Sequence, residues 1–291
     1  MKKLIVWIAL ALCVLACSEK EISKGTIKLY LTDAPVDAEN IASVFISIQE
    51  IQLKKGNDWI TAASFDVPLQ VDILAYQNGQ TYFVTEQEIP TGKYTEARMI
   101  VSDGSSDLAG LADLSYILYE DGSTALLDVP SGTSSGYKAK GEFELSAGGV
   151  VGVTLDFDVR KSIVRAGVSN KLLLKPVVRI VANQSASSIL GTFNKGTISH
   201  KIVIYSYRDG EYRADENMAN ADGLRFTRSV NSTCVKEDGS FTLAFLEAGE
   251  YDLIFTTVTS EGSFENILGI YSLAVQANTI ATVSVTEADL R

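Results

Sequence analysis

Histidine, cysteine and proline are scarce in this chain of 291 residues, which has one histidine, three cysteines and five prolines. Zinc sites are usually built from several His and Cys ligands, so this supply disfavours a zinc centre. A Ser-His-Asp triad would have to use His200, but no Gly-x-Ser-x-Gly elbow is present and His200 falls in a predicted strand. Phosphate-binding loops and dinucleotide fingerprints are absent from the sequence as well.

Positive charge is also in short supply. The chain has 25 Lys and Arg residues against 36 Asp and Glu residues, which gives a net charge of −11. Nucleic-acid binding needs clustered Lys and Arg side chains, and anionic lipid headgroups repel an acidic protein. We therefore expect no nucleic-acid partner, and we expect a lipid rather than the protein surface to hold the chain at a membrane.

The beginning of the chain predicts export. Two lysines precede an apolar run from residue 4 to residue 15, which is too short to span a bilayer comfortably. This run and Ala16-Cys17 resemble the bacterial lipobox, in which the chain is cut before the cysteine and the cysteine is lipidated. The resemblance implies a signal peptide over 1–16 and a lipidated tether over 17–24, with stable anchoring by more than one acyl chain. The alternatives are an ordinary signal peptide that is cut elsewhere and an ordinary N-terminal helix.

The residues after Cys17 indicate a destination. Ser18, in place of an aspartate, resembles the outer-membrane sorting pattern of Gram-negative lipoproteins. Glu19 and Glu21 resemble signals that send such proteins to the cell surface. We therefore expect a lipid-anchored outer-membrane protein that is exposed at the surface of a Gram-negative bacterium.

Almost every segment after residue 25 reads as strand. Apolar and polar residues alternate with a period of two, which is typical of strands with one buried and one wet face. The alternating runs include 27–32, 44–48, 137–145 and 153–160, and turn pairs such as Asn78-Gly79, Asp121-Gly122, Asp209-Gly210 and Asp238-Gly239 separate strands. The pattern predicts an all-β fold with two antiparallel sandwich-like domains in tandem, because tight turns join antiparallel neighbours. The expected core includes Phe143, Leu155 and Phe157.

A polar break at residues 183–188 marks the expected domain boundary, so that the domains cover 25–183 and 189–291. Just before it, one strand is expected over 171–181. Pro176 inside this strand indicates an edge position or a bulge, since proline cannot donate to a ladder.

A short pattern occurs once in each half. An apolar residue, two spacers, a glycine, one spacer and a tyrosine lead into a strand at Tyr94 and again at Tyr251. The glycine permits positive φ, and the tyrosine can bury its ring while its hydroxyl finds a backbone partner. Corner tyrosines of this kind recur in β-sandwiches.

Several segments together resemble the bacterial lipoprotein family called domain of unknown function 4382. They are Gly25–Pro35, Val71–Gly79, Ile89–Tyr94, Leu155–Ser162 and Leu174–Arg179, so the likeness covers about residues 25–182. The family name implies no activity.

The remainder resembles the carboxypeptidase-regulatory, transthyretin-like sandwich domains. The residues that carry this likeness are Gly191-Thr192, Val203–Tyr205 and Asp238–Tyr251. It implies a noncatalytic spacer or recognition module. The polar insertion Arg208–Arg228 departs from the usual pattern and is expected to form a long loop.

Carboxylates are the plentiful functional groups. Asp156 and Asp158 are expected on one face of one strand, roughly 6.5–7 Å apart, a separation that suits glycosidase acids or calcium ligands. Asp33 is a further candidate calcium ligand. The alternatives are a solvated face that Arg160 and Lys161 neutralise, and an Asp33 that caps a turn.

These observations predict a noncatalytic envelope module for binding, adhesion or scaffolding, with no cofactor and with an unidentified glycan or protein ligand. The loops expected to carry recognition are 103–113, 131–136 and 208–228. The last contains Tyr212, Arg213 and Arg225, which are suited to stacking and hydrogen bonding. The alternative is a carbohydrate-active or other hydrolase that uses Asp156 and Asp158.

Overall fold

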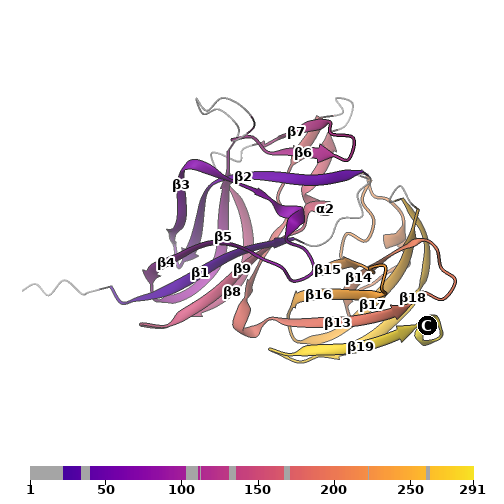
Figure 1. The fold of residues 1–291 in the computed structure, drawn as a ribbon. Helices are drawn as coiled ribbons and strands as arrows, with labels where there is room; N and C mark the ends of the chain where they lie inside the picture. Colours follow the sequence, from indigo (N-terminus) through magenta and orange to yellow (C-terminus); the bar gives the residue numbers. More distant parts are fainter. Residues whose placement is uncertain are drawn as a thin grey trace, which may run out of the picture.

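The computed structural model describes residues 22–33, 40–102, 111, 113–130, 136–166, 171–221, 223–259 and 263–291. Strands dominate these residues, so the expectation of an all-β, sandwich-like fold is confirmed. Every strand ladder joins strands on the same side of residues 183–186. We therefore describe an N-terminal part, residues 24–182, and a C-terminal part, residues 187–291, which lie side by side (Figure 1). Within the described residues, no helix is long and apolar enough to cross a membrane.

The N-terminal part is one 12-stranded sheet with the order β10-β11-β7-β6-β2-β5-β8-β12-β9-β1-β4, and β3 pairs with β2 outside this path. Its strands are β1 (Lys24–Asp33), β2 (Ile41–Lys55), β3 (Asp58–Asp72), β4 (Tyr82–Pro90), β5 (Gly92–Val101), β6 (Tyr116–Tyr119), β7 (Thr124–Asp128), β8 (Tyr137–Leu145), β9 (Val150–Phe157), β10 (Ile163–Ala166), β11 (Lys171–Leu174) and β12 (Val178–Ala182). Short helical turns are η1 (Ile73–Ala75), α2 (Val159–Ser162) and η3 (Asn183–Ser185). The buried apolar side chains of these strands form one core cluster. It includes Phe143, Leu155 and Phe157, which confirms the predicted core.

The C-terminal part has two sheets, β16-β13-β19 and β15-β14-β17-β18. Its strands are β13 (Ser187–Asn194), β14 (Lys201–Arg208), β15 (Asn231–Cys234), β16 (Ser240–Leu246), β17 (Gly249–Val258), β18 (Phe264–Val275) and β19 (Ile280–Thr286), with the turns η4 (Ala214–Asn217) and η5 (Glu287–Asp289). An apolar cluster that includes Phe193, Leu243 and Phe255 draws residues from both sheets, as in a sandwich.

The sequence pattern predicted antiparallel sheets, but some neighbouring strands are parallel. β1 pairs in parallel with β9, and β13 pairs in parallel with β19. The partners of each pair are far apart in the chain, so other strands rather than a tight turn connect them. In both parts, the first strand also has an antiparallel partner, β4 or β16, and so lies inside its sheet.

The single strand expected over 171–181 is two strands, because Pro176 interrupts it. β11 ends at Leu174 and β12 begins at Val178. On either side of the proline, Lys175 donates its backbone N–H to the Ser162 carbonyl at 2.7 Å, and Val177 donates to Ser162 Oγ at 2.8 Å. Ser162 thus provides the hydrogen bonds that a ladder cannot provide here.

Both corner tyrosines are built as the repeated pattern predicts. The Tyr94 hydroxyl donates to the Pro90 carbonyl at 2.6 Å, and the Tyr251 hydroxyl donates to the Glu247 carbonyl at 2.9 Å. In each case the acceptor lies four residues before a fully buried ring. The intervening Gly92 has φ of 133°, in the region that favours glycine. Burial raises the pKa of the Tyr94 hydroxyl to about 12, which keeps this donor protonated.

Removal of either corner hydroxyl should weaken the fold. Tyr94→Phe and Tyr251→Phe each leave a backbone carbonyl without its donor, and we expect each to lower the free energy of unfolding by about 1 kcal/mol. Urea denaturation of the full chain measures this loss. Tyr30→Phe is the control, since the Tyr30 hydroxyl has no hydrogen bond within the described part of the chain. Equal stability of all three variants would mean that the corner hydrogen bonds contribute nothing.

Candidate functional site

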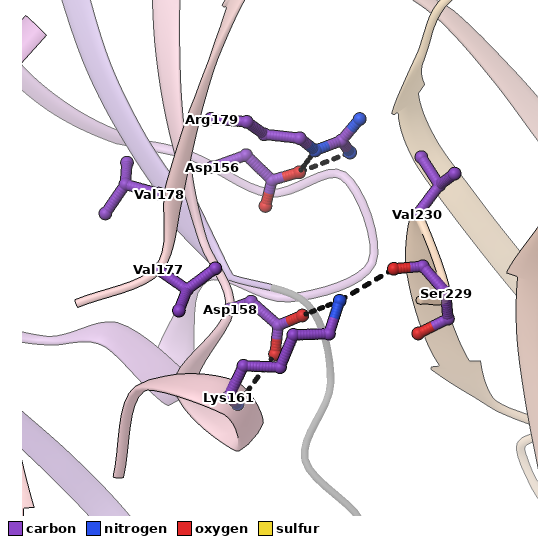
Figure 2. Close-up of a pocket in the computed structure, with 8 residues that line it drawn as sticks. All are labelled: Asp156, Asp158, Lys161, Val177, Val178, Arg179, Ser229 and Val230. Atoms are coloured by element: carbon purple, nitrogen blue, oxygen red, sulfur yellow. Dashed lines mark hydrogen bonds and ion pairs between the residues drawn. The ribbon is translucent and has the colours of Figure 1, made fainter. Parts of the chain in front are cut away.

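The predicted carboxylates lie where the N-terminal and C-terminal parts meet. A pocket of about 230 Å³ opens there, and its walls come from β9, α2 and β12 on one side and from residues before β15 on the other (Figure 2). The lining residues are Asp156, Asp158, Lys161, Val177, Val178, Arg179, Ser229 and Val230. This volume is below the range of most small-molecule sites, which is about 300–1,000 Å³.

Asp156 is paired with Arg179 across two neighbouring strands. The two residues are direct partners in the antiparallel ladder of β9 and β12. Arg179 Nε donates to Asp156 Oδ2 at 2.7 Å, and Nη2 of the same guanidinium donates to the same oxygen. The Asp156 side chain is only 4% exposed. Burial raises the pKa of Asp156 above its ordinary value, and the Arg179 charge opposes this rise.

Asp158 does not share a strand face with Asp156, which corrects the sequence-based expectation. The strand ends at Phe157, and Asp158 caps α2 by accepting the Lys161 backbone N–H at 3.1 Å. Its other oxygen lies 3.0 Å from Lys161 Nζ. Of the alternative, a solvated face that Arg160 and Lys161 neutralise, only the pairing with Lys161 is found, because the Asp158 side chain is only 15% exposed.

Lys161 joins this pair to the C-terminal part. Its Nζ donates to the Ser229 carbonyl at 2.7 Å while it contacts the Asp158 carboxylate (Figure 2). Burial lowers the pKa of Lys161, and the Asp158 charge opposes this effect. The buried Lys161 ammonium group therefore contacts one carboxylate and one carbonyl in place of water.

Arg160 makes a second connection between the two parts. Its guanidinium donates to the backbone carbonyls of Arg225 and Phe226, and to Ser229 Oγ at 3.0 Å. It also lies over the Tyr205 ring, with 5.2 Å between the guanidinium carbon and the ring centroid. From the sequence, Arg160 was expected only to neutralise the carboxylates, and this connecting role was not predicted. No periodicity in the sequence indicates which basic residue will cross between the parts.

Asp33 ends β1 beside the same junction. Its Oδ1 accepts the Val159 backbone N–H at 3.0 Å, and its Oδ2 lies 3.4 Å from Gln77 Nε2. Burial raises the pKa of Asp33 well above its usual value, and the nearby charges of Asp158 and Asp156 add to this rise. Asp33 thus caps α2 from another strand rather than a turn of its own.

Calcium binding at Asp33, Asp156 and Asp158 stays a prediction. The described residues contain no group of three or more His, Cys, Asp or Glu side chains arranged to hold a metal ion. An ion at these oxygens would compete with Arg179 and Lys161 for the same carboxylates.

The insertion 208–228 is packed rather than a free loop, as far as the structure describes it. Phe226, with φ of 51°, is fully buried and stacks on Tyr205 with 4.2 Å between the ring centroids. Glu216 accepts hydrogen bonds from the Tyr207 hydroxyl at 2.9 Å and from the backbone N–H and Nε of Arg228. Burial alone would raise the pKa of Glu216, but these donors and the Arg228 charge hold it below its ordinary value.

The three predicted binding residues of this insertion have different surroundings. The Tyr212 ring contacts Tyr207 edge-on at 5.3 Å. Arg225 donates from Nε to the Asn217 carbonyl at 2.9 Å and lies over the Phe264 ring. Arg213 is exposed at the start of η4.

Other predicted features lie outside this site or outside the described residues. His200 is exposed, immediately before β14, with Nε2 at 3.5 Å from Glu265 Oε2. Cys17 and most of the expected recognition loops, 103–113 and 131–136, lie outside the described residues.

A sequence model of the family described as "Domain of unknown function (DUF4382)" matches residues 24–176, which is more than half of the chain. The expected resemblance is therefore confirmed over these residues. A search of curated proteins finds no match to the chain.

Solved structures show only distant likeness. The TIE protein of Bacillus anthracis is 13% identical, with a TM-score of 0.23 over 91% of this chain and 34% of that protein. A leucine-rich repeat protein from Bacteroides thetaiotaomicron is 12% identical, with a TM-score of 0.20 over 91% of this chain and 26% of the other. GBS52, the minor pilin of Streptococcus agalactiae, is 12% identical, with a TM-score of 0.22 over 89% of this chain and 94% of the pilin. The chain thus spans about a third and about a quarter of the first two proteins, and scores this low transfer no property to it.

Replacement of Asp33 by asparagine should stabilise the chain at neutral pH. Because burial raises the pKa of Asp33 in the folded state, the folded state holds more protons than the unfolded state above about pH 4. The Asp33 contribution to stability therefore falls as the pH rises through the folded-state pKa. Asparagine keeps an oxygen for the Val159 N–H and carries no charge, so the variant should melt at a higher temperature than the wild type at pH 7.

This difference in melting temperature should shrink as the pH falls and disappear by about pH 3, where Asp33 is protonated in both states of the wild type. Thermal unfolding at a series of pH values measures it. Asp66→Asn, at an exposed position, is the control and should show no such trend. A less stable Asp33→Asn variant at pH 7 would contradict the argument, because it would mean that the ionised carboxylate is favourable in the fold.

Proposed function

Because the chain belongs to the family described as domain of unknown function (DUF4382), a description that names no activity, we propose its function from its residues: it is a noncatalytic binding, adhesion or scaffold module of the cell envelope. The observation that carries this proposal is the state of the two candidate catalytic carboxylates. Arg179 neutralises Asp156, and Lys161 neutralises Asp158 while Asp158 caps α2.

Such pairing suits a structural role better than hydrolysis. A hydrolytic pair needs one carboxyl group that can give up a proton and another that can reach substrate or water. At this junction the two side chains are 4% and 15% exposed, and their oxygens already contact cations and a backbone N–H. The hydrolase alternative is favoured by one feature only, the raised pKa of Asp156 at the edge of a pocket.

The junction supports a module in which two parts act as one body. We propose that 25–183 and 189–291 are its two domains, held together by Arg160 and Lys161. The seven strands of the C-terminal part, arranged in two sheets, are compatible with the proposed carboxypeptidase-regulatory-like domain. A rigid pair of β domains is suited to presenting a surface at a distance from a membrane.

We place the module at the outer membrane through a lipid on Cys17. The support is the lipobox-like sequence that ends at Cys17, followed by Ser18. β1 begins at Lys24, so the proposed tether 17–24 leads directly into the sheet. The ligand would be a glycan or a protein of the cell surface.

The catalytic question can be tested with the full chain in detergent. We expect saturable binding to members of a glycan and surface-protein panel, without release of any cleaved product. Asp156→Asn and Asp158→Asn should lower thermal stability, because each leaves a cation of the junction without its charged partner. Lys175→Gln, at an exposed position near the junction, is the control. Turnover that either asparagine variant abolishes would overturn the noncatalytic proposal.

The anchor has its own test, which is metabolic labelling of cells with a fatty acid. The wild-type chain should take up label and stay in the outer-membrane fraction, because two or more acyl chains anchor a protein stably. Cys17→Ala should lose both properties, whereas Cys13→Ala should keep them. Label and membrane retention in the Cys17→Ala variant would show that the lipobox interpretation is wrong.

A further inference from the structure

A cluster of positive charge lies on the outer face of the N-terminal sheet, although the chain as a whole is strongly acidic. We define this basic face by Lys54 of β2, Arg98 of β5, and Lys138 and Lys140 of β8, all around Trp59 of β3. The ladders place these residues in two adjacent rows, Trp59–Lys54–Glu96–Lys140 and Thr61–Gln52–Arg98–Lys138. Intervening residues such as Leu53, Ala97 and Ala139 are buried, so the basic face is the solvent side of the sheet.

Three cations converge on the Trp59 ring. The Arg98 guanidinium carbon lies 4.4 Å from the ring centroid, Lys138 Nζ lies at 5.7 Å and Lys54 Nζ lies at 5.8 Å. These are cation–π distances, and they hold the indole in place beside the positive groups. The site is therefore largely organised before a ligand arrives, which lowers the cost of binding.

The acidic side chains on the basic face do not neutralise its positive charge. Glu96 is the acid at its centre, and Lys54 Nζ lies 2.7 Å from Glu96 Oε1. The hydrogen bond from Lys54, together with the charges of Lys54, Lys138 and Lys140, lowers the pKa of Glu96. Within the described part of the chain, no carboxylate lies at ion-pair distance from Arg98, Lys138 or Lys140. Arg98 instead donates from Nε to the neutral Gln52 Oε1 at 2.9 Å.

Arg98 and Lys138 are direct cross-strand partners. Like charges in this position destabilise a sheet. A chain with 36 acidic residues has ample means to avoid the arrangement. An anion bound across β5 and β8 would relieve the repulsion, so the unneutralised pair points to an anionic ligand.

We propose that the basic face binds an acidic polysaccharide, a glycan chain that carries carboxylate, sulfate or phosphate groups. Its cations are spaced by about 4.8 Å between strands and by about 7 Å along one strand, so an extended chain can meet several of them. The part of the indole that Arg98 does not cover, with its N–H donor, can contact a sugar ring. Gln52 and Thr61 in the neighbouring row both donate to Glu50 Oε1 at 2.7 Å, so they support the face rather than the ligand.

A sparsely charged glycan fits this face better than nucleic acid does. Glu96 sits among the cations, Glu142 lies further along β8, and the chain beyond the face is acidic. At physiological salt the repulsion from these acids reaches about 8 Å, so a dense polyanion would meet it over most of its length. This inference rests on the proposed binding role and names the chemistry of the ligand.

Tryptophan fluorescence provides a local readout of binding. The chain has two tryptophans, Trp7 and Trp59, and Trp7 lies in the segment predicted to be removed. The processed full chain in detergent is titrated with polygalacturonate and with heparin oligosaccharides, which separates carboxylate from sulfate recognition. We expect a saturable change in Trp59 fluorescence, and binding that weakens as the salt concentration rises.

Lys138→Gln/Lys140→Gln removes two exposed cations of the basic face and should weaken binding about tenfold. The matched control, Lys195→Gln/Lys236→Gln, removes the same charge from the C-terminal part and should bind as the wild type does. Calorimetry on Trp59→Phe tests the ring itself and should show weaker binding. Thermal unfolding of each variant checks that the fold is kept.

The proposal is overturned if neither acidic glycan binds, or if the Lys138/Lys140 double variant binds them as the wild type does. It is also overturned if neutral dextran binds equally well, or if single-stranded DNA binds more tightly than both glycans. These outcomes differ from failure of the proposed function. Capture of another surface ligand without turnover would keep the noncatalytic role, whereas glycan hydrolysis would end that role even if the basic face binds.

Discussion

Charge that is removed from water at the junction of the two parts has to be paired there, and this requirement determines how the parts meet. A buried ion that loses its partner costs several kcal/mol, so an ionised group at the junction has one requirement, a partner at the correct position. Asp156 meets it within the N-terminal sheet through Arg179. Lys161 meets it by contacting both Asp158 and the Ser229 carbonyl, which belongs to the other part. The pairing therefore specifies the relative position of two sheets that share no strand ladder.

The order of the insertion 208–228 depends on the same junction. Arg160 donates to the carbonyls of Arg225 and Phe226, and this contact lies beside the stack of Phe226 on Tyr205. Glu216 satisfies the donors at the other end of the segment. A segment of polar composition is thus held by a few buried polar contacts rather than by apolar periodicity. The end of β9 is buried on both faces, because residues of the C-terminal part lie beside Asp156 and Thr154 donates to Asn183 at 2.7 Å.

Local patterns in the sequence predicted the strands, the core residue Leu155 and the corner tyrosines Tyr94 and Tyr251, because each depends on neighbours within a few residues. The parallel pairs were not predicted, since no turn or spacing records which distant strands become neighbours. At the junction, the sequence did not predict the geometry of the two carboxylates Asp156 and Asp158. A period of two suggested that Asp158 continues the strand, whereas its capping of α2 depends on the tertiary contacts of Asp33 and Lys161. The composition did not indicate the basic face either. The total charge of a chain carries no information on which residues become cross-strand partners.

The junction and the basic face give opposite solutions to one electrostatic problem. At the junction the charges are buried, and Asp156 and Asp158 each have a cation within the chain, so these two carboxylates keep little attraction for a charged ligand. On the basic face the cations are in contact with water, which screens their repulsion enough for the fold to tolerate Arg98 opposite Lys138. The remaining positive potential is available only at this surface. The pairing of Asp156 and Asp158 with cations thus favours a structural role for these two carboxylates. The incomplete pairing of the lysines and arginine around Trp59 favours recognition.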